Sequence, residues 1–553
     1  MKKLLLSIVA LAMLMFVSTA SASPGTLTVD QETGGVNHGD ACPSPNYSAD
    51  YASLQAAIDC AVNGDTIEVY DGTYGETGLN GTCEGYPTAI TIENISNLTI
   101  QAAPGQEPVI APVTAGAADI TSVNVTNAPG LTVDNIDSDQ TVAQFDNWHV
   151  CSDDLTVLNS HFEGGEDGID FHTDLTTASI ENNQFVNINT GNGDEVLDFT
   201  DASYSGVVIQ DNYFKNNYRQ ITIFPPTGDS ASNFTIRRNF MDGTNSQEAV
   251  RLIGPDSVTL ENNVIMNSMQ QGLYIDSDSS NVNVWHNSFV NNGFEELRTK
   301  VNSADILIQN NIFYANGGYA ALAASSSALP GENYNLVFNE GSNTESGSQP
   351  AVTSFGANTI TTMDPLFVST TPGSEDLHLQ AGSPALQAGT ELGVTDDIEG
   401  NVRPDPGASN PDMGAYEHPA PNQPPVCDAA AASPDTLWSP NHMFVAISVL
   451  GVTDPDGDPV TTTISSIFQD EPVDANGSGN TAPDGQGVGT STAEVRAERV
   501  GSGNGRYYHI SFTAEDGNGG ACSGVVLVGV PKSQGKNGAP VDDGALYDST
   551  VVP

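Results

Sequence analysis

An asparagine recurs along the middle of the chain, and each copy is followed two positions later by an apolar residue. The steps between successive copies are 29, 27, 24, 24 and 24 residues. Repeats of this length are typical of single coils of a solenoid, so residues one period apart stack on neighbouring coils. We therefore predict a solenoid, in which a functional site forms a column of residues. The six pairs are Asn183 and Phe185, Asn212 and Phe214, Asn239 and Met241, Asn263 and Ile265, Asn287 and Phe289, and Asn311 and Phe313.

The asparagine column has a structural explanation. Stacked coils lie ~4.8 Å apart, the ordinary spacing of strands. An asparagine in a tight turn satisfies nearby backbone groups, and amides repeated on every coil can bond to one another as a ladder. The apolar residue two places later then points inward and fills the core. We expect structural rather than catalytic roles for these asparagines.

The N-terminus has the pattern of a secretory signal peptide, residues 1–22. Lys2 and Lys3 precede an apolar run from Leu4 to Val17, and the small residues 20–22 offer a cleavage site. No other apolar run is long enough to cross a bilayer. We expect a soluble protein that is secreted or held at the cell surface, without membrane insertion.

The charge is strongly one-sided, with 69 acidic and 15 basic residues and a net charge of −54. Removal of Lys2 and Lys3 with the signal peptide makes it −56. Such a surface repels nucleic acid and anionic membranes, so neither is an expected partner. Solubility in a saline habitat explains most of the acidity, and specific cation binding explains the rest. We expect a monomer.

Six cysteines in an exported chain indicate disulfides. Cys427 and Cys522 bracket the last domain and are expected to pair. The four N-terminal cysteines allow three pairings, of which Cys42–Cys60 with Cys83–Cys151 is favoured.

Short alternating strands, separated by Asn, Gly and Asp turns, run from about residue 90 to 320. Before them, residues 50–62 have the pattern of a short amphipathic helix, and residues 65–74 that of a strand and a turn. A helix before the first strand suits a cap over the open end of a solenoid. Residues 23–49 are polar and are expected to be irregular.

This opening resembles the first coil of pectate-lyase-like right-handed parallel β-helices, through Leu54–Asp59, Gly64–Ile67 and Asp71–Tyr74. A later stretch resembles the closing segment of exported bacterial "choice-of-anchor Q" β-helix proteins. Its matching parts are Asp364–Phe367, Leu377–Pro384, Asp397–Pro404 and Asp412–Glu417. This second resemblance implies secretion and a fold but no defined chemistry.

The remaining chain reads as a second domain. Residues 426–531 alternate like a β-sandwich and resemble immunoglobulin- or cadherin-like modules. The predicted fold is therefore all-β, a right-handed parallel β-helix followed by a β-sandwich. The expected segments after the signal peptide are an N-terminal segment (23–49), the β-helix with its helical cap and closing segment 360–418 (50–418), a proline-rich linker (419–425), the sandwich (426–531) and a disordered tail (532–553).

Aligning one strand from each coil places two polar columns on an outer face. The first column is Gln144, Asp170, Asp198, Thr222, Arg251, Tyr274 and Arg298. The second is Asp146, His172, Thr200, Phe224, Ile253, Asp276 and Lys300. The strip is acidic at one end and basic at the other.

Asp170 and Asp198 fall on adjacent coils, so their Cβ atoms are expected ~5 Å apart. Two close carboxylates do not both stay ionised at low cost. Either a cation, most plausibly Ca²⁺, neutralises them, or one carboxyl has a raised pKa. The other predicted ligands nearby are Glu166, Asp167, Asp194 and Glu195. A separate Ca²⁺ turn is predicted at Asp454, Asp456 and Asp458, although such turns also occur without an ion.

The resemblance to β-helix polysaccharide lyases implies one mechanism. Ca²⁺ held by Asp170 and Asp198 would neutralise a uronate carboxylate, and Arg251, Lys215 or Arg219 would remove the C5 proton. The expected glycan-binding residues are Tyr274, Phe224, Arg298, Lys300 and His172.

Two other hypotheses remain open at the sequence level. Asp170 and Asp198 have the residue types of a glycoside hydrolase pair. Alternatively, the protein is a non-catalytic surface or matrix protein that binds glycan, in which case Arg251 pairs with Glu248 and His172 is an ordinary surface residue. The signature motifs of polygalacturonases and alginate epimerases are absent from the sequence, which favours the binder. The clustering of scarce bases between residues 215 and 300 favours the lyase.

Overall fold

The structure is a computed structural model of the chain. It describes residues 24–32, 34–44, 46, 50–112, 120–141, 145–188, 195–276, 278–300, 304–327, 329–345, 349–419, 422–474, 476–535 and 538–552. The predicted signal peptide, Gln144 and Asp194 lie outside these residues. Among the described residues, no helix is long and apolar enough to cross a membrane.

The chain divides into two compact units. The first contains residues up to 400 together with 412–416, and the second contains 401–411 together with residues from 417 onward. The chain passes into the second unit at residue 401, returns to the first at 412–416, and leaves it for the last time at residue 417.

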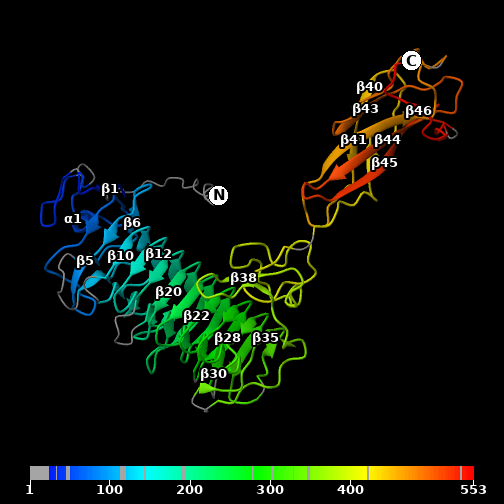
Figure 1. Ribbon diagram of the computed structural model, residues 1–553. Helices are drawn as coiled ribbons and strands as arrows, with labels where there is room; N and C mark the ends of the chain where they lie inside the picture. Colours follow the sequence, from blue (N-terminus) through cyan, green and yellow to red (C-terminus); the bar gives the residue numbers. More distant parts are fainter. Residues whose placement is uncertain are drawn as a thin grey trace. The chain divides into compact units, whose positions relative to one another are not determined.

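The first unit is a parallel β-helix whose coils contribute strands to three long sheets (Figure 1). The 13-stranded sheet contains β1 (Thr26–Val29), β2 (Thr66–Val69), β6 (Thr99–Ala102), β9 (Thr132–Asp134), β12 (Leu155–Leu158), β15 (Ala178–Glu181), β18 (Tyr204–Ser205), β19 (Val207–Gln210), β22 (Ala231–Arg237), β25 (Asp256–Glu261), β28 (Ser280–Trp285), β31 (Ala304–Gln309) and β34 (Glu332–Asn333). The 12-stranded sheet contains β3 (Thr73–Tyr74), β7 (Val109–Ile110), β10 (Asp137–Asp139), β13 (His161–Glu163), β16 (Gln184–Val186), β20 (Tyr213–Asn217), β23 (Phe240–Thr244), β26 (Val264–Met266), β29 (Ser288–Val290), β32 (Ile312–Tyr314), β35 (Leu336–Phe338) and β36 (Ile360–Thr361).

The 11-stranded sheet carries the predicted polar strip. Its strands are β4 (Leu79–Asn80), β5 (Pro87–Glu93), β8 (Thr121–Thr126), β11 (Trp148–Cys151), β14 (Ile169–Phe171), β17 (Leu197–Phe199), β21 (Ile221–Ile223), β24 (Val250–Leu252), β27 (Leu273–Ile275), β30 (Leu297–Thr299) and β33 (Leu322–Ala323). All neighbours in this sheet are parallel except β4 and β5. Residues in one row therefore stack directly on successive coils.

The asparagine ladder is confirmed. On Asn263, for example, Nδ2 donates to Oδ1 of Asn287 at 2.9 Å, and Oδ1 accepts from Nδ2 of Asn239 at 3.0 Å. The ladder extends one coil beyond the predicted copies, to Asn335. Each ladder asparagine is buried and follows a residue with positive φ, such as Asn262 (φ 56°). The apolar residues two places later are buried too, and four of them stack as two pairs of aromatic rings, Phe185 with Phe214 and Phe289 with Phe313, each with centroids 5.1 Å apart.

A short helix, α1 (Leu54–Cys60), lies at the N-terminal end of the β-helix, as predicted. The hydroxyl of Ser53 accepts a hydrogen bond from the backbone N–H of Ala56 and caps the helix. The residues before it are not wholly irregular. Thr26–Val29 form β1, which pairs in parallel with β2, because Leu27 and Val29 are apolar and fill the first coil of the core.

The closing segment packs on the outside of the 12-stranded sheet. Its strands β37 (Phe367–Ser369) and β38 (Asp376–Leu379) form a small antiparallel pair. Leu377, Leu379 and Met413 bury their side chains against outward-facing residues of β26, β29, β32 and β35. This cover explains why these four strands are apolar on both faces.

The second unit contains two four-stranded antiparallel sheets that enclose their own core, as the β-sandwich prediction requires. One sheet contains β39 (Ala431–Ser433), β40 (Phe444–Leu450), β43 (Thr492–Arg496) and β42 (Gly485–Gln486). The other contains β45 (Ala521–Val530), β44 (Arg506–Glu515), β41 (Thr461–Gln469) and β46 (Tyr547–Asp548).

The prediction of a disordered tail from residue 532 is wrong for its C-terminal part. Strand β46 pairs with β41, and the backbone of the buried Ser549 bonds to Ile467, Asp484 and Gly485. The tail satisfies backbone groups at the edge of β41 that would otherwise face water.

The three disulfides are those predicted. Cys42 pairs with Cys60, Cys83 with Cys151, and Cys427 with Cys522.

Candidate functional site

The outer row of the 11-stranded sheet has the predicted register over most of its length. Asp170 lies opposite Asp198, Asp198 opposite Thr222, and Thr222 opposite Arg251. The row continues through Tyr274 to Arg298. The strip therefore exists as one continuous face of stacked coils.

The alignment of the coil before Asp170 is wrong. Gln144 is the residue predicted there, but the residue opposite Asp170 is His149. Both Ala143–Phe145 and Trp148–Val150 alternate apolar and polar residues, so periodicity alone did not distinguish them. The backbone hydrogen bonds of the strand, such as those from Asn147 to Asp167 and from Trp148 to Gly168, set the true register. The error hid the histidine that is most deeply buried in the site.

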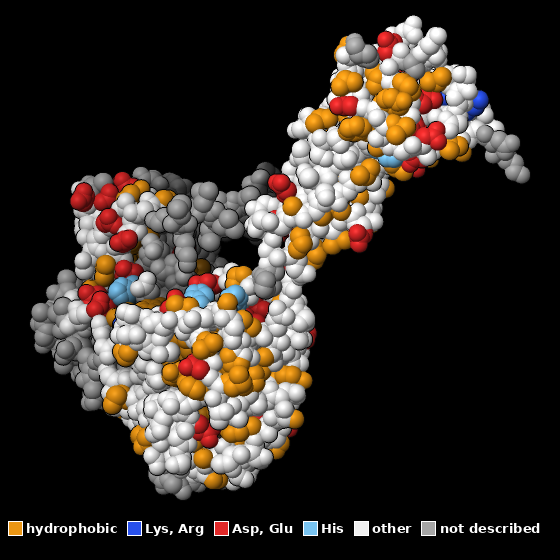
Figure 2. Space-filling model, turned by 45° about the vertical axis from the view of Figure 1, so that its right-hand side comes forward, with side chains coloured by type: hydrophobic (Ala, Val, Ile, Leu, Met, Phe, Trp, Pro, Cys, Tyr) orange, Lys and Arg blue, Asp and Glu red, His pale blue; other side chains and the backbone are white. Residues whose placement is uncertain are grey.

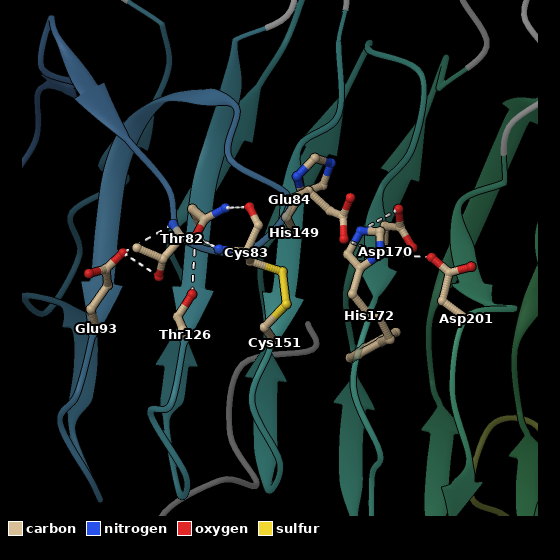
Figure 3. Close-up of a disulfide and its surroundings, with 12 residues drawn as sticks. Thr82, Cys83, Glu84, Glu93, Thr126, His149, Cys151, Asp170, His172 and Asp201 are labelled. Carbon is tan, nitrogen blue, oxygen red and sulfur yellow. Dashed lines mark hydrogen bonds and ion pairs between the residues drawn. A yellow bond between two sulfur atoms is a disulfide. The ribbon is translucent and has the colours of Figure 1, made fainter. Parts of the chain in front are cut away.

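His149, Asp170 and His172 form a compact cluster at the acidic end of the strip (Figure 3). One nitrogen or oxygen atom from each lies within 4.8 Å of the other two. The two imidazole rings stand edge to face with centroids 5.1 Å apart. Nε2 of His172 lies 2.9 Å from Oδ2 of Asp170. His149 is only 2 % exposed, and the other two side chains are mostly buried.

Each histidine also contacts a carboxylate outside the cluster. Nε2 of His149 lies 2.7 Å from Oδ2 of Asp146, which is itself buried. Nδ1 of His172 lies 2.8 Å from Oδ2 of Asp201. These contacts orient both rings. Nδ1 of His149 is left without a hydrogen-bond partner, and Nε2 of His172 is left facing Asp170.

The crowded charges shift two pKa values. Burial, together with the negative charges of Asp170 and Glu195, raises the pKa of Asp198 to about 8. Burial alone would lower the pKa of His172, but the carboxylates of Asp170 and Asp201 outweigh it and raise the value to about 9. At neutral pH, without a bound cation, the cluster therefore holds a neutral Asp198 and a charged His172.

Four further residues were predicted as Ca²⁺ ligands beside Asp170 and Asp198. Asp194 lies outside the described residues. Asp167 accepts the backbone N–H of Glu195, and Glu195 itself pairs with the buried Arg219. Glu166 donates its backbone N–H to the carbonyl of Phe145. The groups that share the cluster with Asp170 are imidazoles, whereas Ca²⁺ prefers a shell of oxygen atoms. This donor set does not fit Ca²⁺.

A loop closes one side of the cluster. The Cys83–Cys151 disulfide ties this loop, residues 81–86, to β11, two positions after His149 (Figure 3). Asn124 bonds to both the N–H and the carbonyl of Cys83. The ring of Tyr86 in the same loop contacts that of His149, with centroids 5.5 Å apart. The disulfide thus fixes a wall of the site.

The basic end of the strip is built around one aromatic ring. Three cations lie beside Tyr274, with Arg251 5.8 Å, Arg298 5.3 Å and Lys300 5.1 Å from the ring centroid. Lys300 pairs with Asp276 at 2.8 Å, and Arg298 is buried and pairs with Glu345.

Lysine and arginine are scarce on the face shown in Figure 2, over which acidic side chains are scattered.

Arg251 is the least engaged of these three cations. Its nearest carboxylate oxygens belong to Glu248 at 3.5 Å and Asp276 at 3.8 Å, and its Nε has no hydrogen-bond partner. The ion pair with Glu248, which is expected if Arg251 has no catalytic role, is therefore present, but its distance of 3.5 Å is long. Its contacts with Tyr274 and Asp276 turn the guanidinium toward the following coil and away from Asp198.

Of the other two candidate bases, Lys215 lies away from the strip, and Arg219 borders it at Thr222. Lys215 lies on β20 of the 12-stranded sheet, where it pairs with Asp242 at 3.2 Å. Arg219 is 5 % exposed and pairs with Glu195 and Glu248, so it is a structural residue. The register also separates Arg251 from Asp198 by two coils, ~10 Å. The predicted base at Arg251 and the predicted cation site at Asp170 and Asp198 are thus separated along the stack of coils.

Phe224 lies between the two ends of the strip. It directly follows β21 and is 47 % exposed, an unusual state for a large aromatic side chain. Aromatic faces of this kind are suitable platforms for the apolar face of a sugar ring.

In the second unit, Asp454, Asp456 and Asp458 also lie close together, with one oxygen of each within 4.8 Å of the others. Oδ2 of Asp454 has no hydrogen-bond partner. Unlike the histidine cluster, this group offers oxygen atoms only.

Comparison with known proteins agrees with the fold. A family model described as "Right handed beta helix region" matches residues 147–298 and 227–361. Among solved structures, pectate lyase Pel9A is 16 % identical, with a TM-score of 0.41 over 72 % of this chain and 98 % of that one. A rhamnogalacturonan lyase is 14 % identical, with a TM-score of 0.36 over 62 % and 91 %. The A-module of mannuronan C-5 epimerase AlgE4 from Azotobacter vinelandii is 14 % identical, with a TM-score of 0.35 over 61 % and 100 %.

None of the curated proteins matches this chain. Identities and TM-scores this low do not indicate a reaction or a substrate. The sheet topology and the family-model match together show that the first unit is a right-handed parallel β-helix.

Proposed function

We propose that this protein is exported and acts on or binds an acidic polysaccharide, which lies along the outer face of the 11-stranded sheet. The observation that carries the proposal is the cationic group at Tyr274. Three of the 15 basic residues of the chain surround this one ring. In a protein of net charge −54, such a group is a specific place for a carboxylate or sulfate to bind.

The rest of the face supports a long, chain-like ligand. Arg251 lies three coils from Asp170, ~14 Å along the stack. The exposed ring of Phe224 lies between them. A glycan that runs in the direction in which the coils stack would contact the cations at one end, the ring of Phe224 in the middle and the histidine cluster at the other end.

Three disulfides and the resemblance of the closing segment to exported bacterial proteins support export. For the second unit we propose an immunoglobulin- or cadherin-like module with Ca²⁺ in the turn of Asp454, Asp456 and Asp458, because that turn offers only oxygen ligands.

Binding is tested with pectate, alginate and chondroitin sulfate, and with dextran as an uncharged comparison. The double variant Arg251→Ala/Lys300→Ala is expected to bind its acidic glycan about tenfold or more weakly, because two charge-assisted contacts are lost. Affinity electrophoresis or calorimetry provides the measurement.

Lys215→Ala is the matched control, because this exposed lysine lies on a different sheet. It should bind like the unaltered protein. Failure of the protein to bind any acidic glycan, or an equal loss in Lys215→Ala, would refute the assignment of this face.

The same mixtures test catalysis. A rise in ultraviolet absorbance from unsaturated uronate would identify a lyase, the enzyme class that we place first. Release of reducing ends without that absorbance would indicate hydrolysis, the alternative that uses Asp170 and Asp198. Binding without either signal would identify a non-catalytic surface or matrix protein.

A further inference from the structure

We propose that His149, Asp170 and His172 bind a divalent transition-metal ion of the Zn²⁺ type, with Asp198 beside it on the next coil. This inference does not depend on the proposed glycan function. It rests on the donor atoms, on their missing partners and on the groups that hold them.

Three buried atoms of the cluster lack any hydrogen-bond partner. They are Nδ1 of His149, Oδ1 of Asp170 and Oδ1 of Asp198. Buried polar atoms are nearly always paired, because an unpaired one costs ~1–3 kcal/mol. A metal ion held by His149, Asp170 and His172 would supply the partner that the first two atoms lack, with Asp198 beside it on the next coil.

The outer contacts of the two histidines match those of metal ligands. A histidine that binds a metal through one nitrogen usually donates the other N–H to a carboxylate, which fixes the ring and its tautomer. His149 has Asp146 in this position at 2.7 Å, and His172 has Asp201 at 2.8 Å. The other nitrogens are then left for the metal: Nδ1 of His149, which has no hydrogen-bond partner, and Nε2 of His172, which lies 2.9 Å from its fellow ligand Asp170.

The donor set selects the kind of ion. Two imidazole nitrogens and one carboxylate suit Zn²⁺ and related transition metals, whereas Ca²⁺ and Mg²⁺ take oxygen ligands. Three protein ligands also leave a coordination position open for water or a ligand oxygen. His149 and His172 stack on adjacent coils, and the disulfide-anchored loop fixes one wall, so the site is preformed.

Metal binding is measured on untagged mature protein that has been stripped with a chelator. Titration with Zn²⁺ in a calorimeter should show a single tight site that millimolar Ca²⁺ does not displace. Co²⁺ in place of Zn²⁺ should give visible absorption bands from nitrogen and oxygen ligands. His149→Gln and His172→Gln should each weaken Zn²⁺ binding by about 100-fold or more, and Asp201→Asn by about 10–100-fold.

His161→Gln is the matched control. His161 is a more exposed histidine on β13 of the 12-stranded sheet, with a carboxylate 3.9 Å away, and its loss should leave Zn²⁺ binding unchanged. Asp201→Asn keeps the test valid if a variant of a buried histidine does not fold, because the Asp201 side chain is 52 % exposed. Absence of a tight Zn²⁺ site in the unaltered protein, or the same affinity in His172→Gln and Asp201→Asn as in the unaltered protein, would overturn the assignment.

Discussion

Replacing Asn263 with alanine is expected to lower the free energy of unfolding of the β-helix by about 3 kcal/mol or more. The side chain is fully buried in the middle of the ladder. Its amide donates to Ile236 and Asn287, and its oxygen accepts two bonds from Asn239. Alanine would leave these partners buried without hydrogen bonds and would create a cavity. Calorimetry that resolves the unfolding of the two units provides the measurement.

Asn283→Ala is the matched control for the ladder. Asn283 points outward from β28 in the next coil, and its amide makes only a weak contact with Thr259 at 3.4 Å. Its loss should change the stability of the β-helix by less than about 0.5 kcal/mol. Equal effects of the two substitutions would show that the ladder contributes little to the stacking of coils.

Arg506→Ala is expected to destabilise the second unit by about 3–5 kcal/mol. Arg506 is fully buried and contacts Asp484 at 2.8 Å and Glu471 at 3.1 Å. Removal of the guanidinium would leave Glu471 and Asp484 in the interior without their nearest counter-charge, since Arg496 lies 3.9 Å from Asp484. The thermal unfolding transition of the second unit should move to lower temperature, while the transition of the β-helix stays at the same temperature.

The comparison residue in the same unit is Arg499. It is partly exposed and bonds only to backbone carbonyls, among them that of Pro531 at 3.2 Å. Arg499→Ala should cost less than about 1 kcal/mol, because no carboxylate loses its partner. If Arg506→Ala leaves the unfolding transition of the second unit unchanged, the buried ion pairs of Arg506 are not needed for the fold of that unit.

Most of the solenoid follows from the spacing of short motifs. The asparagine repeat predicted the coil length, the ladder and the inward phenylalanines, and it correctly placed Asp170 opposite Asp198. The cysteine pattern led to the observed disulfides. The properties of the repeat recur with a fixed period, so the sequence carries them directly.

The errors arise where the period is interrupted. His149 was missed because Ala143–Phe145 and Trp148–Val150 show the same alternation, and the first was taken as the strand. The pairing of β46 (Tyr547–Asp548) with β41 was missed because a segment this short forms a strand only where the edge of another strand is free to pair with it. A histidine two residues before a cysteine in an apolar strand was the one available signal for His149, and the assumed register concealed it.

The sequence by itself determined the repeat, the stacking of the columns and the split of the strip into acidic and basic ends. The tertiary structure decided which atoms in those columns have partners. Arg219, Arg298 and Lys215 belonged to one group of scarce bases in the sequence, but two are buried in ion pairs and one lies on another sheet. The physical reason is that stacking sets neighbours along the coil axis, whereas burial and hydrogen bonding depend on turns and loops such as the disulfide-anchored residues 81–86. Those contacts have no period in the sequence, and they turn a row of polar residues into a histidine–carboxylate cluster.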